Sequence, residues 1–252
     1  MTINKTIITT SVFILMIFIT NAQDLDGADT YEDIISATPI SLAGGGSLLD
    51  WANLKKFEHS NDELNKTNDP NRVVFMGNSI TEGWSVFNKD FFIDNPFVNR
   101  GISGQTTPQM LVRFKPDVIN LSPKAVVIMA GINDIARNTG PISVENTADN
   151  IISMAEIAIA NNITVYICST LPAIDLLWSP GLNPAPKVIK LNAILKNYCK
   201  ENGLTYVDYY SSMVDTEGGL KVPEYTAAND LVHPNLVGYK VMEKIILKSL
   251  KL

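Results

Sequence analysis

The chain has 252 residues, of which 46% are hydrophobic and 18% are charged, and its formal net charge is −6 at pH 7. A chain of this length can bury a substantial core as one domain. Its net acidity disfavours nucleic acid and anionic lipid surfaces as partners, because both present negative charge.

The first residues of the chain predict a secretory signal. Lys5 is the only charged side chain before Asp24, and an apolar run occupies residues 12–19. Small residues at positions 20 and 22 suit cleavage after position 22. The run is shorter than the roughly 20 apolar residues that span a bilayer. We therefore expect residues 1–22 to be a signal peptide, no membrane insertion after its removal, and a periplasmic or secreted protein.

The rest of the chain alternates between strand-like and helix-like segments. Residues 23–47 are acidic and then glycine-rich, so we expect a flexible lead-in to a single domain over residues 48–252. Apolar runs predict strands at 72–76, 125–130, 164–169 and 205–208, and helical spacing predicts helices at 48–66, 108–115, 144–161, 187–202 and 237–250. Continuous apolar strands are typical of parallel sheets covered on both faces. The order of the segments therefore predicts an α/β sandwich.

Ser79 is a candidate nucleophile at the end of the first predicted strand. It lies in a Gly-x-Ser turn, where its own N–H would lie at a helix N-terminus and favour negative charge. Sites in parallel sheets form beyond the carboxyl ends of the strands. Thr81 stands where the Gly-x-Ser-x-Gly motif of α/β-hydrolases has its second glycine. A helix N-cap is the simpler interpretation of Ser79 taken alone.

The chain has two histidines, which narrows the choice of a general base. His59 lies in a polar stretch of the first predicted helix, and we expect it on the surface. His233 follows Asp230 by three residues, so the Asp230 carboxylate can reach the His233 ring, fix its tautomer and stabilise its charged form. A surface aspartate beside a helix-capping histidine is an equally good interpretation of this pair alone.

Gly101 and Asn133 are candidate donors to an oxyanion. A tetrahedral intermediate needs N–H groups aimed at the oxygen on which charge develops, and losing one donor costs ~3 kcal/mol of barrier. Gly101 can bring its main-chain N–H close because it lacks a Cβ, and Asn133 can donate from its side-chain amide. Taken singly, a turn and a helix cap are the simpler interpretations of these two residues.

Trp84 and Trp178 are candidate surfaces for substrate binding. Trp84 closely follows Ser79, and Trp178 lies in the proline-rich loop 171–186, which is long for a connection of this kind. Aromatic faces suit sugar rings and acyl chains, and core packing is an equally good interpretation of both.

The two cysteines, Cys168 and Cys199, lie in a predicted strand and a predicted helix. We expect two buried free thiols. A disulfide is the alternative that export would permit.

Four short blocks in chain order resemble the SGNH hydrolases, also called GDSL esterases and lipases: residues 77–81, Gly101, residues 131–134 and residues 230–233. The resemblance spans roughly residues 70–252. Residues 99–107 are similar to the branch of platelet-activating-factor acetylhydrolase catalytic subunits and bacterial carbohydrate O-acetylesterases. The resemblance implies a flavodoxin-like three-layer α/β/α fold with about five parallel strands, and no metal or organic cofactor.

The resemblance also implies a role for each candidate residue. Ser79 would be the nucleophile, His233 the general base and Asp230 its partner. The main-chain N–H groups of Ser79 and Gly101 and the side chain of Asn133 would form the oxyanion hole.

Together these features predict an exported serine esterase that removes small acyl groups, above all acetyl, from a carbohydrate through an acyl-Ser79 intermediate. One alternative keeps the triad and makes the chain a lysophospholipase, thioesterase or arylesterase. Another is a catalytically silent glycan-binding module, for which the one supporting feature is Asn78, where the family usually has aspartate. The sequence does not decide the natural substrate or the oligomeric state.

Overall fold

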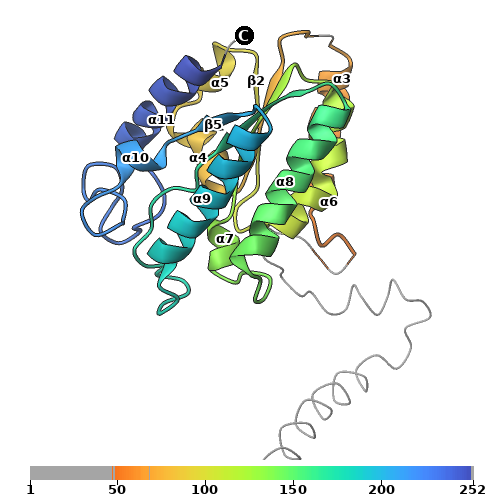
Figure 1. The fold of residues 1–252 in the computed structure, drawn as a ribbon. Coiled ribbons are helices and arrows are strands. Elements are labelled where there is room, and N and C mark those ends of the chain that lie inside the picture. Colours follow the sequence, from red (N-terminus) through yellow and green to blue (C-terminus); the bar gives the residue numbers. More distant parts are fainter. Residues whose placement is uncertain (1–46, 48, 68, 251–252) are drawn as a thin grey trace, which may run out of the picture.

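The computed structural model describes residues 47, 49–67 and 69–250. The expected signal peptide, and the lead-in except residue 47, lie outside the described residues. Five strands form one parallel sheet (Figure 1), and their order in the sheet is β2-β1-β3-β4-β5. They are β1 (Val73–Gly77), β2 (Phe97–Gly101), β3 (Ala125–Met129), β4 (Thr164–Cys168) and β5 (Thr205–Val207).

Helices cover both faces of the sheet. One face packs against α4 (Ser79–Phe87), α5 (Asp90–Ile93), α10 (Tyr210–Met213) and α11 (Leu236–Ser249), and the other against α6 (Thr107–Asp117), α8 (Val144–Ala160) and α9 (Pro184–Glu201). Shorter or peripheral elements are η1 (Leu54–Phe57), α3 (Glu58–Asn65), η2 (Ile119–Leu121) and α7 (Ile132–Ile135). The predicted α/β sandwich is confirmed, and its strand order is the flavodoxin-like one.

Strand β1 shows how one sheet supports two cores. Val73 and Phe75 belong to the core beneath α4 and α11, while Val74 and Met76 belong to the core beneath α6 and α8. All four side chains are buried. A strand that is buried on both faces has no position that faces water. For this reason β1 and β3 are continuous apolar runs in the sequence.

The four predicted strands and the four predicted helices after residue 100 are confirmed to within three residues at each end, a normal uncertainty for element boundaries. The helix expected over 48–66 is shorter in the structure. Asn53 has a φ of 55°, and this left-handed residue separates the upstream segment from η1 and α3. Strand β2 is missing from the predicted elements because Asn99 and Arg100 interrupt its apolar pattern.

Cys168 and Cys199 are both buried, and both are free thiols. Burial raises the pKa of Cys168 to about 12 and that of Cys199 to about 11, so neither forms a thiolate at neutral pH. Of the helices in the described part of the chain, none is both long and apolar enough to cross a bilayer.

Candidate active site

Ser79 is the first residue of α4 and lies directly beyond the carboxyl end of β1. The N-cap of α4 is Asn78, whose Oδ1 accepts the N–H of Ile80 at 3.1 Å. The neutral amide at this position therefore does the work of a helix cap. A Cβ on Gly77 would lie 1.9 Å from Oγ1 of Thr81, so only glycine lets the chain turn this tightly from strand to helix.

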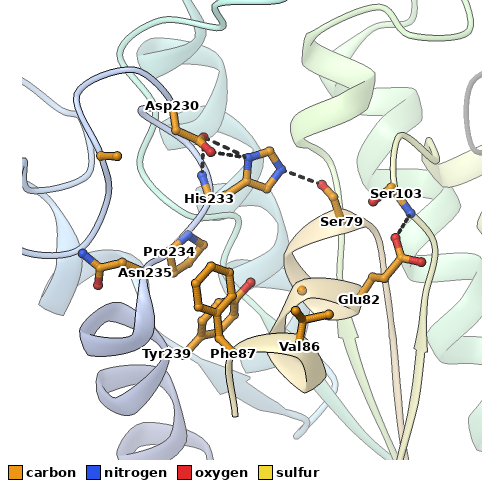
Figure 2. A pocket seen from close by; sticks show the side chains of 12 residues that line it. Ser79, Glu82, Val86, Phe87, Ser103, Asp230, His233, Pro234, Asn235 and Tyr239 are labelled. Atoms are coloured by element: carbon orange, nitrogen blue, oxygen red, sulfur yellow. Dashed lines mark hydrogen bonds and ion pairs between the residues drawn. The ribbon is translucent and has the colours of Figure 1, made fainter. Parts of the chain in front are cut away.

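Ser79, His233 and Asp230 form one chain of hydrogen bonds (Figure 2). Ser79 Oγ lies 2.9 Å from His233 Nε2, and His233 Nδ1 lies 2.8 Å and 3.1 Å from the two carboxylate oxygens of Asp230. An ionised carboxylate only accepts hydrogen bonds, so the proton of a neutral His233 is assigned to Nδ1. Nε2 is then free to accept the proton of Ser79, as nucleophile activation requires.

The turn that carries Asp230 and His233 is tightly specified. Oδ1 of Asp230 also accepts the main-chain N–H groups of Val232 at 3.1 Å and of His233 at 2.9 Å. Leu231, between Asp230 and Val232, has a φ of 70°, in the left-handed region that leucine rarely adopts. Partial burial raises the pKa of Asp230, but the hydrogen bonds from His233 and Val232 together outweigh burial and lower this pKa below its ordinary value. Asp230 is therefore a carboxylate at neutral pH.

Gly101 does not have the role that the sequence predicts. It is the last residue of β2 and pairs with Gly77 in the sheet, and its N–H donates to Oδ1 of Asn99 at 2.8 Å. A Cβ on Gly101 would lie 2.1 Å from the main-chain nitrogen of Glu82. The glycine lets β2 approach α4 closely, and the prediction that it supplies an oxyanion donor is wrong.

Gly104, three residues further on, lines a cavity together with Ser79. This cavity has a volume of about 270 Å³, and Asn133 and His233 also line it. The φ of Gly104 is 77°, which favours glycine. Because Gly101 and Gly77 are paired inside the sheet, the residues level with Ser79 come only after Gly101. A strand that ends at Gly101 places the next glycine, Gly104, in the loop beyond the sheet, and this is the signal in the sequence that indicates Gly104.

Asn133 lies beside the same cavity, in the first turn of α7. Its side chain is buried, and Nδ2 donates to the main-chain oxygen of Gln105 at 2.9 Å. An amide nitrogen carries two hydrogens, so this bond leaves one for an oxyanion. The bond to Gln105 also ties Asn133 to the loop that contains Gly104.

Asp134 anchors the same turn to the start of α6. Its Oδ1 accepts the hydroxyl of Thr107 at 2.6 Å and the Thr107 N–H at 3.0 Å. Burial is the main reason that the pKa of Asp134 is raised, to about 6, and the bonds from Thr107 oppose this effect only partly. The folded protein therefore holds a proton on Asp134 more tightly than the unfolded chain does.

A pH-dependent contribution to stability follows from Asp134. A raised carboxyl pKa contributes stability that is fully present below the unfolded value of 3.8 and is lost as pH rises through about 6. Asp134→Asn removes this pH dependence. As pH rises from about 4 to about 7, we therefore expect its free energy of unfolding to increase relative to that of wild type by on the order of 2–3 kcal/mol. Denaturant unfolding at several pH values measures this difference, with Asp149→Asn, at an exposed site on α8, as the control. A pH-independent difference for Asp134→Asn would contradict the prediction.

The two tryptophan candidates lie in different surroundings. Trp84 is 1% exposed, stacks on Phe91 at a ring distance of 5.1 Å and donates from Nε1 to Glu243. The prediction that Trp84 binds substrate is therefore wrong, because its ring belongs to the core. Trp178 is 45% exposed, lines the 270 Å³ cavity, and its ring lies 6.3 Å from that of His233.

A second cavity of about 460 Å³ is lined by residues of α4 and by residues at the start of α11 (Figure 2). Phe87, Tyr239 and Glu82 help to line it, and the rings of Phe87 and Tyr239 lie 5.4 Å apart. Both cavities include Ser79 and His233, so an ester bound over Ser79 would extend into each of them. His59 is exposed on α3 and lines neither cavity.

Within residues 47, 49–67 and 69–250, no group of three or more histidine, cysteine, aspartate or glutamate side chains is placed to hold a metal ion. The chemistry that these residues can perform is nucleophilic attack by serine with help from a histidine base.

Comparison with known proteins points to the same chemistry. The chain is similar to a protein assigned as an acylhydrolase from Bacteroides fragilis (51% identity, 79% of this chain and 96% of the other, TM-score 0.75). It is also similar to a GDSL-like lipase from Bacteroides thetaiotaomicron (46% identity, 78% and 96%, TM-score 0.74). A variant of an acetylxylan esterase from Geobacillus stearothermophilus shares the fold (19% identity, 73% and 95%, TM-score 0.59).

A curated relative and a family model complete the comparison. An uncharacterized lipoprotein of Bacillus subtilis is 25% identical over 156 residues, and the match spans 64% of that protein's length. Residues 75–241 match the model of the GDSL-like lipase/acylhydrolase family, which is more than half of the chain. The chain belongs to this family and is an ester hydrolase.

Proposed function

We propose that the chain is an exported serine esterase that removes short acyl groups, above all acetyl, from a carbohydrate. The observation that carries this proposal is the hydrogen-bonded chain of Ser79, His233 and Asp230 beside a cavity of about 270 Å³, the smaller of the two cavities described above.

In the proposed reaction, Ser79 Oγ attacks the ester carbonyl while His233 Nε2 takes the serine proton. Asp230 stabilises the imidazolium that results. The N–H groups of Ser79 and Gly104 and the Nδ2 of Asn133 would donate to the oxyanion, with Gly104 in the role first expected of Gly101. His233 then returns the proton to the leaving alcohol. In the second half of the reaction, His233 takes a proton from water as the water attacks the acyl-Ser79 carbonyl, and it returns this proton to Ser79 Oγ as the carboxylic acid leaves.

Two further observations support the substrate and the location. The exposed ring of Trp178 beside the cavity offers a flat face of the kind on which sugars stack, and the fold is shared with an acetylxylan esterase. Export is supported by the signal sequence expected at residues 1–22 and by the similarity to a lipoprotein of Bacillus subtilis.

A series of p-nitrophenyl esters from acetate to octanoate tests the proposal, with Ser79→Ala as the inactive reference. We expect kcat/KM to be highest for acetate and to fall at least about tenfold by octanoate, a discrimination that a shape-limited pocket can supply. Release of acetate from acetylated xylooligosaccharides is the second expected result. A kcat/KM that rises with acyl length would instead favour a lipase or thioesterase role.

A further inference from the structure

Glu82 lies one helical turn after Ser79 and reaches across to the loop after β2. Its Oε2 accepts the main-chain N–H of Ser103 at 2.8 Å, and its Oε1 forms an ion pair with Lys56 (Figure 2 shows the bond to Ser103). Ser103 directly precedes Gly104. The reaction proposed above assigns no role to Glu82.

The backbone of Glu82 is held firmly against the end of β2. Because Gly101 has no Cβ, its Cα approaches the main chain at Thr81 and Glu82 closely. Asn99 reinforces this contact, since its Nδ2 donates to the oxygen of Thr81 while its Oδ1 accepts the N–H of Gly101. The side chain of Glu82 therefore starts from a fixed position when it reaches Ser103.

The loop around Gly104 is also held from its other side. The main-chain oxygen of Gly104 accepts a bond from Asn138 at 3.0 Å, and that of Gln105 accepts one from Asn133. Both of these bonds come from residues that follow β3. The bond from Ser103 to Glu82 is different, because it joins the loop to the helix that carries the nucleophile.

We propose that Glu82 is a positioning residue for the oxyanion hole, which fixes the N–H of Gly104 relative to Ser79 by accepting the N–H of Ser103. This inference rests on the proposed function. Oxyanion donors act only when they are held at the place where charge develops, and a misplacement of about 1 Å can cost about 10²-fold in rate.

The role of Glu82 predicts different results for two substitutions. Glu82→Ala removes the acceptor, and we expect kcat for p-nitrophenyl acetate to fall about 10- to 100-fold with KM within about threefold of wild type. Glu82→Gln removes the charge and keeps one carbonyl oxygen, which can accept from Ser103 while the exposed Lys56 turns to water. We therefore expect Glu82→Gln to restore kcat to within about threefold of wild type.

A second readout does not depend on turnover. A fluorophosphonate reacts with an activated serine and places its phosphoryl oxygen in the oxyanion hole, so we expect the labelling rate of Ser79 to fall in Glu82→Ala and to recover in Glu82→Gln. Glu145→Ala is the matched control, because Glu145 is also ion-paired with a lysine, Lys190, but lines neither cavity beside Ser79. Unfolding temperatures show whether each variant is folded.

Three outcomes would overturn the role of Glu82. They are an unchanged kcat in Glu82→Ala, a loss as large in Glu82→Gln as in Glu82→Ala, and an effect confined to KM, which would indicate contact with the substrate. In each case an active wild-type chain would leave the proposed function standing. A wild-type chain that neither hydrolyses the ester nor reacts with the fluorophosphonate would overturn the proposed function and this inference with it.

Discussion

Replacing Ser79 by alanine should lower kcat for p-nitrophenyl acetate by at least about 10³-fold. The substitution removes the atom that attacks the ester, and water alone would have to replace it. The oxyanion donors and His233 would remain, so a small residual rate above that of buffer is expected. The free energy of unfolding should change little, because Ser79 is only half-buried. Within the described residues, its hydroxyl forms a hydrogen bond only with His233.

Ser85→Ala is a matched control for this experiment. Ser85 lies on the same helix, is also half-buried, and its hydroxyl donates to the main-chain oxygen of Glu82 at 3.0 Å. We expect Ser85→Ala to keep kcat within about threefold of wild type, because no step of the reaction uses this hydroxyl. Equal activity in Ser79→Ala and wild type would refute a covalent mechanism through Ser79.

The sequence predicts the fold well where burial on both faces leaves a simple pattern. β1 and β3 lie in the middle of the sheet, and their continuous apolar runs make both visible as strands. β2 lies at the edge of the sheet. Its Asn99 contacts α4, and its Arg100 donates two hydrogen bonds to Asn61. These polar contacts are made through tertiary structure, and for that reason the strand pattern is hidden.

The candidate triad is predictable because histidine is scarce and the Asp230–His233 spacing is short. The choice between Gly101 and Gly104 cannot be predicted in this way, because it depends on which residues of β2 are paired with β1. Trp84 is a different case, since the sequence does hold a signal. Ile80 and Trp84 are four residues apart on α4, which places both on one face, and both are buried.

The orienting role of Asp230 predicts a large effect for a small substitution. In Asp230→Asn, the amide oxygen can keep the bonds from the N–H groups of Val232 and His233 that Oδ1 now accepts, so the turn should fold. The amide oxygen would stay 2.8 Å from His233 Nδ1, while the amide nitrogen takes the place of Oδ2, 3.1 Å from the same atom. Because this nitrogen donates and does not accept, it weakens the preference for a proton on Nδ1 and raises the share of the tautomer that cannot accept the proton of Ser79. The amide also has no charge with which to stabilise the imidazolium.

We therefore expect kcat/KM of Asp230→Asn to fall about 10²- to 10⁴-fold. The hydrogen bonds that lower the pKa of Asp230 keep the wild-type carboxylate ionised, so the deficit should be nearly constant from about pH 7.5 to about pH 9, above the ordinary pKa of histidine. Asp208→Asn is the matched control, because Asp208 also accepts the main-chain N–H three residues on, from Ser211. A deficit below about threefold would mean that His233 needs no carboxylate, and one that disappeared within this pH range would mean that a different group orients the ring.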